Sequence, residues 1–128
     1  MNNPSKNITN KKQIIITAGD ESGIGPEVIL KALYYKKIPK NITIKLVGSK
    51  RNFESTYQNL KNIGITNIAD PINFQIFDLE EPCYIKKSKK SYGEASFNYL
   101  KKGIEIVQKH INSALVTGPI CKKSWALA

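Results

Sequence analysis

One loop of the sequence combines three glycines, three carboxylates and a proline between a predicted strand and a predicted helix. It covers residues 17–27, and its Gly23 and Gly25 permit backbone shapes that other residues resist. Pro26 suits the first position of a helix, where free amide groups are a natural place for an anionic group. The loop lacks the Gly-Lys-Ser/Thr of a Walker loop and the third glycine of a G-x-G-x-x-G fingerprint. A ligand site and a purely structural turn therefore both stay open, and Asp20 is open to the same two interpretations.

A second loop, residues 117–123, places a lysine just beyond another predicted strand. Lys122 could bind a phosphate or a carboxylate there as a compact point charge. The competing interpretation is a solvated pair formed with Lys123. Cys121 has no histidine close in sequence to activate its thiol, so we assign it no nucleophilic role.

Metal-binding patterns are absent from the sequence. Cys83 and Cys121 fit neither a C-x-x-C motif nor a zinc pattern. His110 is the single histidine, and it falls near the end of a predicted helix without a Cys, His or carboxylate cluster around it. We expect it to be a surface or helix-end residue.

Strand and helix patterns alternate along the chain. Strands are predicted over residues 13–17, 42–46, 73–77 and 113–117, and helices over residues 26–35, 51–62 and 95–111. This order favours an α/β layer structure with right-handed crossovers. Because both loops leave the carboxyl ends of strands, where open α/β sheets gather ligand sites, we expect Gly25 and Lys122 to line one crevice.

The predicted helix over residues 95–111 carries the clearest amphipathic pattern. A single apolar stripe is formed at steps of three and four by Phe97, Leu100, Ile104, Val107 and Ile111. Glu105 and Lys109 are predicted to pair on its exposed side.

Composition sets the remaining bounds. Residues 1–12 are expected to be a flexible tail, residues 13–128 the structured part, and residues 80–93 an irregular charged loop. The net charge is +10, but the lysines are scattered and there is one arginine, so we predict no nucleic-acid partner. No secretory signal or membrane-spanning run is visible, and the two cysteines suit a reducing cytoplasm.

Three segments together resemble the 4-hydroxythreonine-4-phosphate dehydrogenase family. The first is Gly19-Asp20-Glu21-Ser22-Gly23-Ile24-Gly25-Pro26-Glu27, which resembles the family's opening signature although Glu21-Ser22 replaces a Pro-Ala or similar pair. The second is Tyr92-Gly93-Glu94-Ala95-Ser96, followed by an amphipathic helix. The third is Ala114-Leu115-Val116-Thr117-Gly118-Pro119-Ile120-Cys121-Lys122. They occur in the family's order and spacing.

The resemblance implies an isocitrate/isopropylmalate dehydrogenase-like layered α/β fold, of which this chain is the amino-terminal part. It implies NAD, a divalent metal (zinc, magnesium or cobalt), a phosphorylated small-molecule substrate and a homodimer. Metal-binding histidines and most substrate contacts are expected beyond Ala128, in a longer natural product. The residues expected in or near the cleft are Asp20, Gly23, Gly25, Pro26, Thr117 and Lys122. A sheet with an unfinished edge is expected to aggregate or to pair with another chain.

Three functions stay open at this point. The first is NAD-dependent oxidation, with decarboxylation, of 4-phosphooxy-L-threonine in pyridoxine 5'-phosphate synthesis, with the present chain inactive alone. The second is the same chemistry on 4-phospho-threonate or 4-phospho-erythronate. The third is a non-catalytic α/β module that binds an anion.

Overall fold

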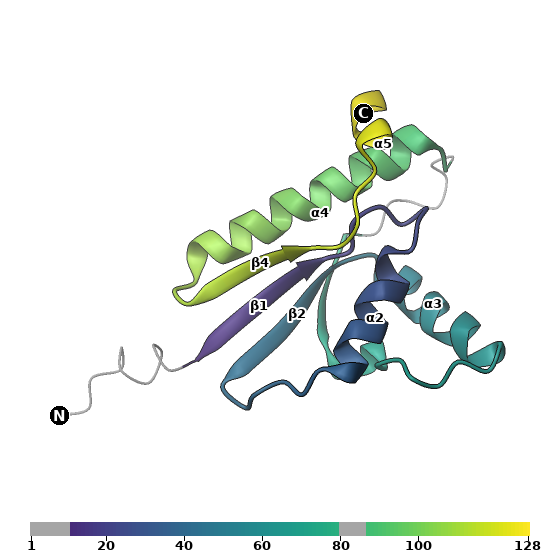
Figure 1. Cartoon of the computed structure of the whole chain (residues 1–128). Coiled ribbons are helices and arrows are strands. Elements are labelled where there is room, and N and C mark those ends of the chain that lie inside the picture. The colour runs from purple at the N-terminus through teal and green to yellow at the C-terminus, as the bar shows by residue number, and fades with distance from the viewer. Residues whose placement is uncertain (1–10, 80–86) are drawn as a thin grey trace.

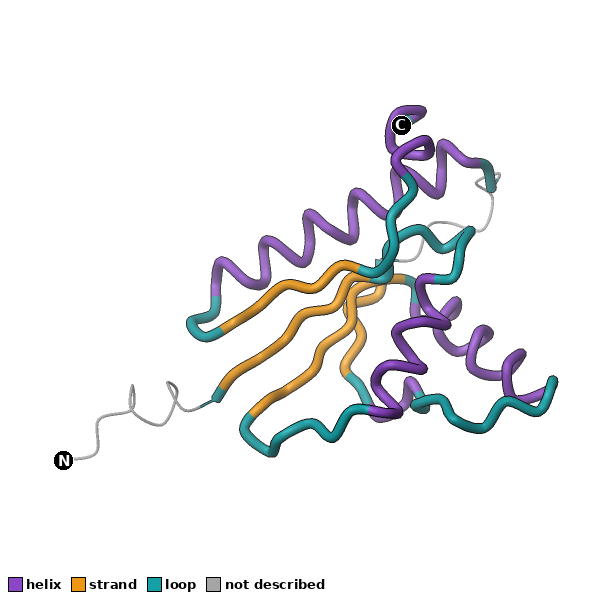
Figure 2. The backbone as a smooth tube through the Cα atoms, viewed as in Figure 1, coloured by secondary structure: helices purple, strands orange, loops and turns teal. Residues whose placement is uncertain are grey.

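A computed structural model describes residues 11–79 and 87–128 and contains a four-stranded parallel sheet. The strands are β1 (Lys12–Thr17), β2 (Ile42–Gly48), β3 (Gln75–Asp78) and β4 (Ser113–Thr117). Their order across the sheet is β3-β2-β1-β4, so β1 lies between β2 and β4 (Figure 1). Loops that leave the carboxyl ends of the strands gather at one edge of the sheet (Figure 2). The predicted parallel α/β fold is confirmed in this form.

Helices cover both faces of the sheet. One face carries α2 (Gly25–Tyr35) and α3 (Lys50–Asn62), and the other carries α4 (Lys89–Lys109), as Figure 1 shows. A short helix, α5 (Lys122–Leu127), follows β4 and packs on α4, and a 3₁₀ turn, η1 (Pro71–Asn73), precedes β3. Neighbouring side chains of a strand point to opposite faces, so a sheet covered twice can bury consecutive residues.

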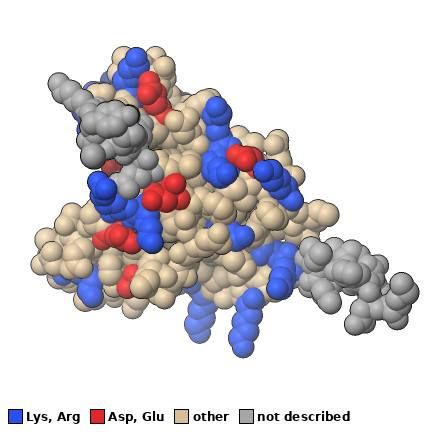
Figure 3. Space-filling view, turned by 180° about the vertical axis from the view of Figure 1, so that it is seen from behind, with Lys and Arg blue, Asp and Glu red and all other residues tan. Residues whose placement is uncertain are grey.

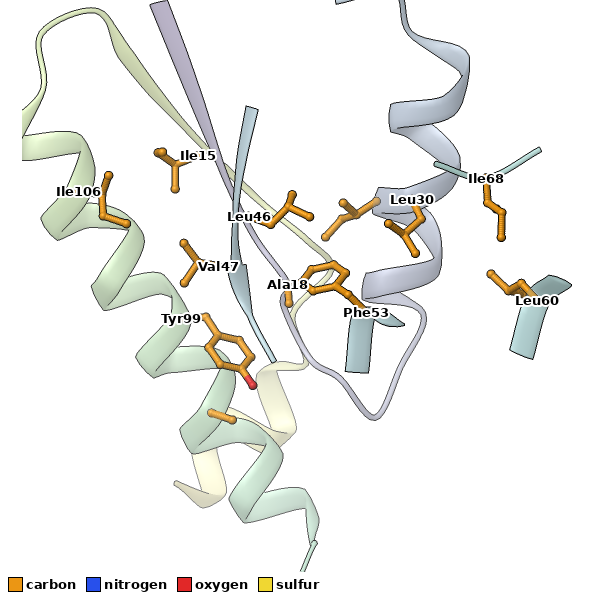
Figure 4. Close-up of a cluster of buried hydrophobic side chains, with 12 residues drawn as sticks. Ile15, Ala18, Leu30, Leu46, Val47, Phe53, Leu60, Ile68, Tyr99 and Ile106 are labelled. Atoms are coloured by element: carbon orange, nitrogen blue, oxygen red, sulfur yellow. The ribbon is translucent and has the colours of Figure 1, made fainter. Parts of the chain in front are cut away.

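Strand β2 shows this double burial at its carboxyl end. Leu46 and Val47 are both fully buried. Val47 lies on the side of Tyr99 of α4, and Leu46 lies on the side of Leu30 of α2 (Figure 4). The core therefore has two halves, one on each side of the sheet.

Glycine lets α4 approach the sheet closely. A Cβ atom on Gly103 would lie 2.8 Å from Leu115 Cδ1 and 2.8 Å from Thr17 Cγ2. The face of α4 that meets the sheet thus consists of Tyr99, Gly103 and Ile106, which step by four and three residues.

The predicted bounds of α4 were wrong at its start. The helix begins at Lys89, inside the segment expected to be an irregular loop. Ser88 caps it: Ser91 N donates to Ser88 Oγ at 3.2 Å, and Ser88 N donates to Ser91 Oγ at 2.8 Å. This reciprocal pair satisfies two backbone amides at the start of the helix. The sequence analysis did not identify it, because both serines lie in a lysine-rich segment. Residues 80–86 of the expected loop lie outside the described residues, as do residues 1–10 of the expected tail.

The predicted apolar stripe of α4 was wrong about which residues meet the sheet. Phe97, Ile104 and Ile111 are exposed, and Leu100 and Val107 are only half-buried. The sequence pattern ignored Gly103, because a residue without a side chain adds nothing to an apolar stripe although it allows the closest contact.

Other boundaries moved for local reasons. Asn73 belongs to the 3₁₀ turn and not to β3, because Asp70 Oδ1 accepts a hydrogen bond from Ile72 N at 3.0 Å and caps that turn. The pair of Glu105 with Lys109 is confirmed at 3.2 Å. His110 is exposed at the end of α4, as predicted.

Candidate functional site

The two loops singled out in the sequence touch each other. Because β1 and β4 are parallel neighbours, their carboxyl ends release the loops side by side. Asp20 N donates to Pro119 O at 2.9 Å, and Gly118 N donates to Thr17 O at 2.7 Å. We call this pair of segments, residues 18–24 and 118–121, the paired loops.

Two glycines allow tight backbone contacts here: Gly118 lies in the paired loops, and Gly25 follows the first of them. A Cβ atom on Gly25 would lie 2.2 Å from Ala18 O, and one on Gly118 would lie 2.6 Å from the same oxygen. By contrast, a Cβ atom on Gly23 would have an ordinary contact at 3.6 Å. Gly25 and Gly118 are therefore required by the fold of the loops themselves.

Asp20 is the most deeply buried carboxylate of the paired loops, at 4% exposed. Its Oδ1 accepts hydrogen bonds from Ser22 N, at 2.8 Å, and from Ser22 Oγ. Its Oδ2 is buried without a hydrogen-bond partner among residues 11–79 and 87–128. A buried polar atom without a partner is uncommon, and this one is able to accept a hydrogen bond from a donor.

Glu21 links three elements at the same edge of the sheet. Its Oε1 accepts from Tyr99 Oη of α4 at 2.8 Å and from Ser49 N, at the start of α3, at 3.0 Å. Burial raises the pKa of Glu21, while the hydrogen bonds from Tyr99 and Ser49 and the charge of Lys87 lower it in part. The sequence did not reveal these contacts of Glu21, because no local pattern indicates partners so far along the chain.

The start of α2 borders a shallow hollow between α2 and α3. The hollow measures about 220 Å³ and is lined by Glu21, Gly23, Ile24, Pro26, Glu27, Thr56, Asn59 and Leu60. No side chain caps this helix start. Its amides would favour an anion, but Glu21 and Glu27 bring two carboxylates to the same hollow and oppose one. The hollow is not suited to a phosphate.

The second loop presents Thr117 and Lys122 to solvent. Lys122 begins α5, which packs on α4, whereas Gly25 begins α2 on the opposite face of the sheet (Figure 1). The structure thus brings the two loops together at Asp20 and Pro119 and then carries Gly25 and Lys122 away on different sides of the sheet.

Cys121 is the residue that precedes α5. Hydrogen bonds with the side chain and the backbone of Ser124 lower its pKa, with a smaller effect from the backbone of Lys123. A lowered pKa raises the thiolate fraction. However, the single histidine, His110, lies at the end of α4, and the other cysteine, Cys83, lies outside the described residues.

Neither a metal centre nor a membrane span is found in the described part of the chain. Residues 11–79 and 87–128 contain no group of three or more His, Cys, Asp or Glu side chains that could hold a metal ion. None of their helices is long and apolar enough to cross a membrane. Lys and Arg side chains are spread over the face seen in Figure 3, with Asp and Glu between several of them.

A parallel α/β sheet with two touching loops at its carboxyl edge belongs to the class of folds that bind ligands at that edge. The predicted resemblance to 4-hydroxythreonine-4-phosphate dehydrogenases is confirmed. Such a protein from Synechococcus sp. (strain JA-3-3Ab) is 35% identical over 118 residues, which cover 88% of this chain and 34% of that protein. A second relative, from Fusobacterium nucleatum, has the provisional name D-threonate 4-phosphate dehydrogenase and is 28% identical to this chain. The match covers 89% of this chain and 38% of that protein.

Solved structures agree on the fold. The 4-hydroxythreonine-4-phosphate dehydrogenase of Burkholderia phymatum superposes with a TM-score of 0.70 at 24% identity, over 91% of this chain and 39% of that chain. No family model matches the sequence. The chain thus spans about a third of the length of the curated relatives it matches.

Proposed function

We propose that this chain supplies one part of an NAD-dependent dehydrogenase for a phosphorylated hydroxy acid, with 4-phosphooxy-L-threonine as substrate. The observation that carries the proposal is the contact between the paired loops. It is supported by a relative named 4-hydroxythreonine-4-phosphate dehydrogenase, whose match covers 88% of this chain. In this reaction the secondary alcohol is oxidised by NAD, and the resulting β-keto acid loses carbon dioxide. The isocitrate/isopropylmalate dehydrogenase-like arrangement of two lobes and the homodimer are parts of the same proposal.

Residues of the paired loops and of the segments that flank them would take different roles. Lys122 is exposed and its ammonium group is a compact positive charge, so we assign this group to the substrate phosphate. Asp20 offers its unpartnered Oδ2 to a hydroxyl or ammonium group of the substrate. Gly25 and Pro26 would hold the backbone of the first loop in place, and Gly23 and Thr117 would lie beside the bound substrate.

The described residues do not fit a metal centre, since no cluster of ligand side chains is present among them. Backbone contacts leave no room beside Gly19 and Gly25 of the first loop, and two carboxylates line the hollow beside α2. These residues alone therefore form no cradle for a dinucleotide pyrophosphate. Zinc, magnesium or cobalt, and the binding site of NAD, stay expectations for the longer relatives. The proposal assigns none of the described residues to holding these groups.

A second substrate is favoured by one observation. The Fusobacterium nucleatum relative carries the name of a dehydrogenase acting on D-threonate 4-phosphate. Both substrates bear a phosphate and a secondary hydroxyl, so the roles of Lys122 and Asp20 would be the same.

The proposal is tested by mixing the chain with the part of the Synechococcus relative that it does not match, and following NADH formation on each substrate. We expect no turnover by either piece alone and turnover by the mixture. Lys122→Ala should raise KM for the phosphorylated substrate about tenfold, as expected when a charge-assisted contact of about 1.4 kcal/mol is lost.

Lys123→Ala is the matched control, because Lys123 is the next residue of α5 and is also exposed. Equal effects of the two substitutions would contradict the role of Lys122. A stable complex of the two pieces that oxidises neither substrate would contradict the dehydrogenase proposal and would favour an anion-binding module.

A further inference from the structure

A basic recess lies at the end of the sheet where the strands begin, opposite the end that carries the paired loops. It measures about 510 Å³, and its charged lining comes from three separate segments: Lys11 and Lys12 at the start of β1, Lys45 in β2, and Lys109 at the end of α4. His110 lines it as well, and among the described lining residues there is no Asp or Glu. The fold thus gathers lysines that are far apart in the sequence.

Lys45 is the lysine of this recess that is hardest to explain as ordinary surface charge. It belongs to β2, an inner strand that pairs with both β1 and β3. It shares the α4-facing side of the strand with Val47, two residues further on (Figure 4). It is half-buried, and within residues 11–79 and 87–128 its side chain has no hydrogen-bond or ion-pair partner. An ammonium group that has lost part of its hydration favours an anion beside it.

Polar side chains of the neighbouring strands lie between the charges. Gln13 of β1 is opposite Thr43 of β2 in the register of the sheet, and both line the recess. Gln13 Nε2 donates to Ser113 Oγ at 3.0 Å, which holds the amide in place. Thr43 is exposed, so its hydroxyl is available to donate a hydrogen bond to a ligand oxygen.

The end of α4 forms the rim of the recess. Lys109 has a side chain that is 68% exposed, and Glu105 Oε1 accepts from it at 3.2 Å. Glu105 also lies 3.6 Å from Lys102, so one carboxylate is shared by two lysines. Cations at a helix end stabilise the helix dipole, which accounts for Lys109 and His110 without any ligand. It does not account for Lys45, which lies on a strand.

The charge and the size of the recess together indicate its ligand. Figure 3 shows blue side chains at the lower right of the molecule, the end where the strands begin, and no red side chain among them. A volume of about 510 Å³ is within the range of about 300–1,000 Å³ that small-molecule sites occupy. Lysine ammonium groups are compact point charges that suit phosphate oxygens. Several of them around one recess suit a ligand that carries several phosphates in a row.

We propose that the basic recess binds a chain of two or three phosphates, either inorganic or carried by a nucleotide. Lys45 lies deepest in the recess, and Lys12 and Lys109 lie at its rim. The proposal goes beyond the proposed function and does not depend on it, since none of these residues belongs to the paired loops. A nucleic acid fits less well, because it needs a longer run of positive charge, whereas Asp and Glu lie between several of the other Lys and Arg side chains (Figure 3).

Titration calorimetry of the chain with inorganic triphosphate, and separately with adenosine triphosphate, tests the proposal. We expect one site per chain and a dissociation constant that rises with sodium chloride, because salt screens the lysine charges. Lys45→Gln should raise the constant at least about tenfold, since a half-buried charge-assisted contact is lost. Lys109→Gln should raise it about threefold, because its side chain is largely exposed. Equal affinities would show that the phosphates suffice, and tighter binding of the nucleotide would show that its nucleoside adds contacts; both support the proposal.

Lys50→Gln is the matched control. Lys50 begins α3 beyond the other end of β2 and is exposed, so this substitution removes the same charge outside the recess. It should change the dissociation constant by less than about twofold. Circular dichroism of each variant separates lost folding from lost binding. If Lys45→Gln does not fold, Lys109→Gln decides the matter, because a side chain that is 68% exposed contributes little to folding.

Three results would overturn the proposal. The first is the absence of saturable binding of either triphosphate to the folded chain. The second is equal weakening by Lys50→Gln and by the recess variants, which would show attraction to the net charge and not a site. The third is a single-stranded RNA oligonucleotide that binds more tightly than triphosphate and is released by Lys45→Gln, which would assign the recess to nucleic acid.

Discussion

The hydroxyl of Tyr99 donates a hydrogen bond to Glu21 Oε1 at 2.8 Å and joins α4 to the β1–α2 loop across 78 positions of the sequence. The same oxygen accepts from Ser49 N, so one carboxylate holds the β1–α2 loop, α3 and α4 together. Asp20 is the residue before Glu21. The position of the candidate ligand group therefore depends on a contact between elements on both faces of the sheet.

Removing the tyrosine hydroxyl should destabilise the fold. Tyr99 is 2% exposed, and Tyr99→Phe leaves Glu21 with one fewer donor in a partly buried place. We expect the free energy of unfolding to fall by about 1–3 kcal/mol, measured by urea denaturation. Tyr34→Phe is the control, because Tyr34 is 50% exposed. Equal effects of the two substitutions would show that the Tyr99–Glu21 bond does not stabilise the fold.

The stability of the fold should depend on pH through Glu21. Burial raises its pKa above the ordinary value of 4.5, so folding favours the protonated form. The corresponding stabilisation is fully present below pH 4.5 and is lost as the pH rises through the raised pKa. The free energy of unfolding of the unmodified chain, minus that of Glu21→Gln, should therefore decrease from acidic to neutral pH. Chemical denaturation of both proteins at several pH values measures this difference, and a difference that grows with pH would refute the assignment.

The predictions that succeeded from sequence rest on local patterns. β4 was predicted with its observed bounds because a short, mainly apolar run ends at Gly118-Pro119, and Gly25 was placed beside the start of α2 by the proline that follows it. The two loops touch, as expected from strand alternation, since parallel neighbours release their loops at one edge. The shared crevice expected for Gly25 and Lys122 is not among these successes, because the two residues begin helices on different sides of the sheet.

The predictions that failed depend on contacts between distant residues. The partners of Glu21 come from α3 and α4, and no spacing along the chain indicates them. The stripe of α4 is a real apolar pattern, but Gly103 directs a different side of the helix to the sheet. Helix α5 is too short to show a periodic pattern, and its packing on Gly93 is a tertiary effect.

Two glycines of the first loop should differ sharply in their tolerance of alanine. Gly25→Ala places a Cβ atom 2.2 Å from Ala18 O, whereas Gly23→Ala meets Asp20 O at 3.6 Å. We expect Gly25→Ala to lower the free energy of unfolding by about 1–3 kcal/mol, because backbone must move to relieve the overlap. Gly23→Ala should change it by less than about 0.5 kcal/mol. Thermal and urea denaturation compare the two variants, and a larger loss for Gly23→Ala would show that the loop is folded differently.

The packing of α5 on α4 can be followed through the single tryptophan of the chain. Trp125 Nε1 donates to Ser96 Oγ at 2.6 Å, and Gly93 of α4 lies close to the backbone of α5 at Ser124. A Cβ atom there would lie 2.1 Å from Ser124 O, so Gly93→Ala should displace α5 and expose the indole to water. The fluorescence emission of Trp125 should then shift to longer wavelength.

Most of the fold should survive that displacement, because α5 has six residues and buries only Ser124 completely. Far-ultraviolet circular dichroism is therefore expected to change little while the emission moves. Ser96→Ala provides an independent check, since it removes the indole partner without adding volume and should give a smaller shift in the same direction. Gly23→Ala, in the first loop, is the control that should leave the emission unchanged. An unshifted spectrum in Gly93→Ala would mean that α5 is not held against α4 at this contact.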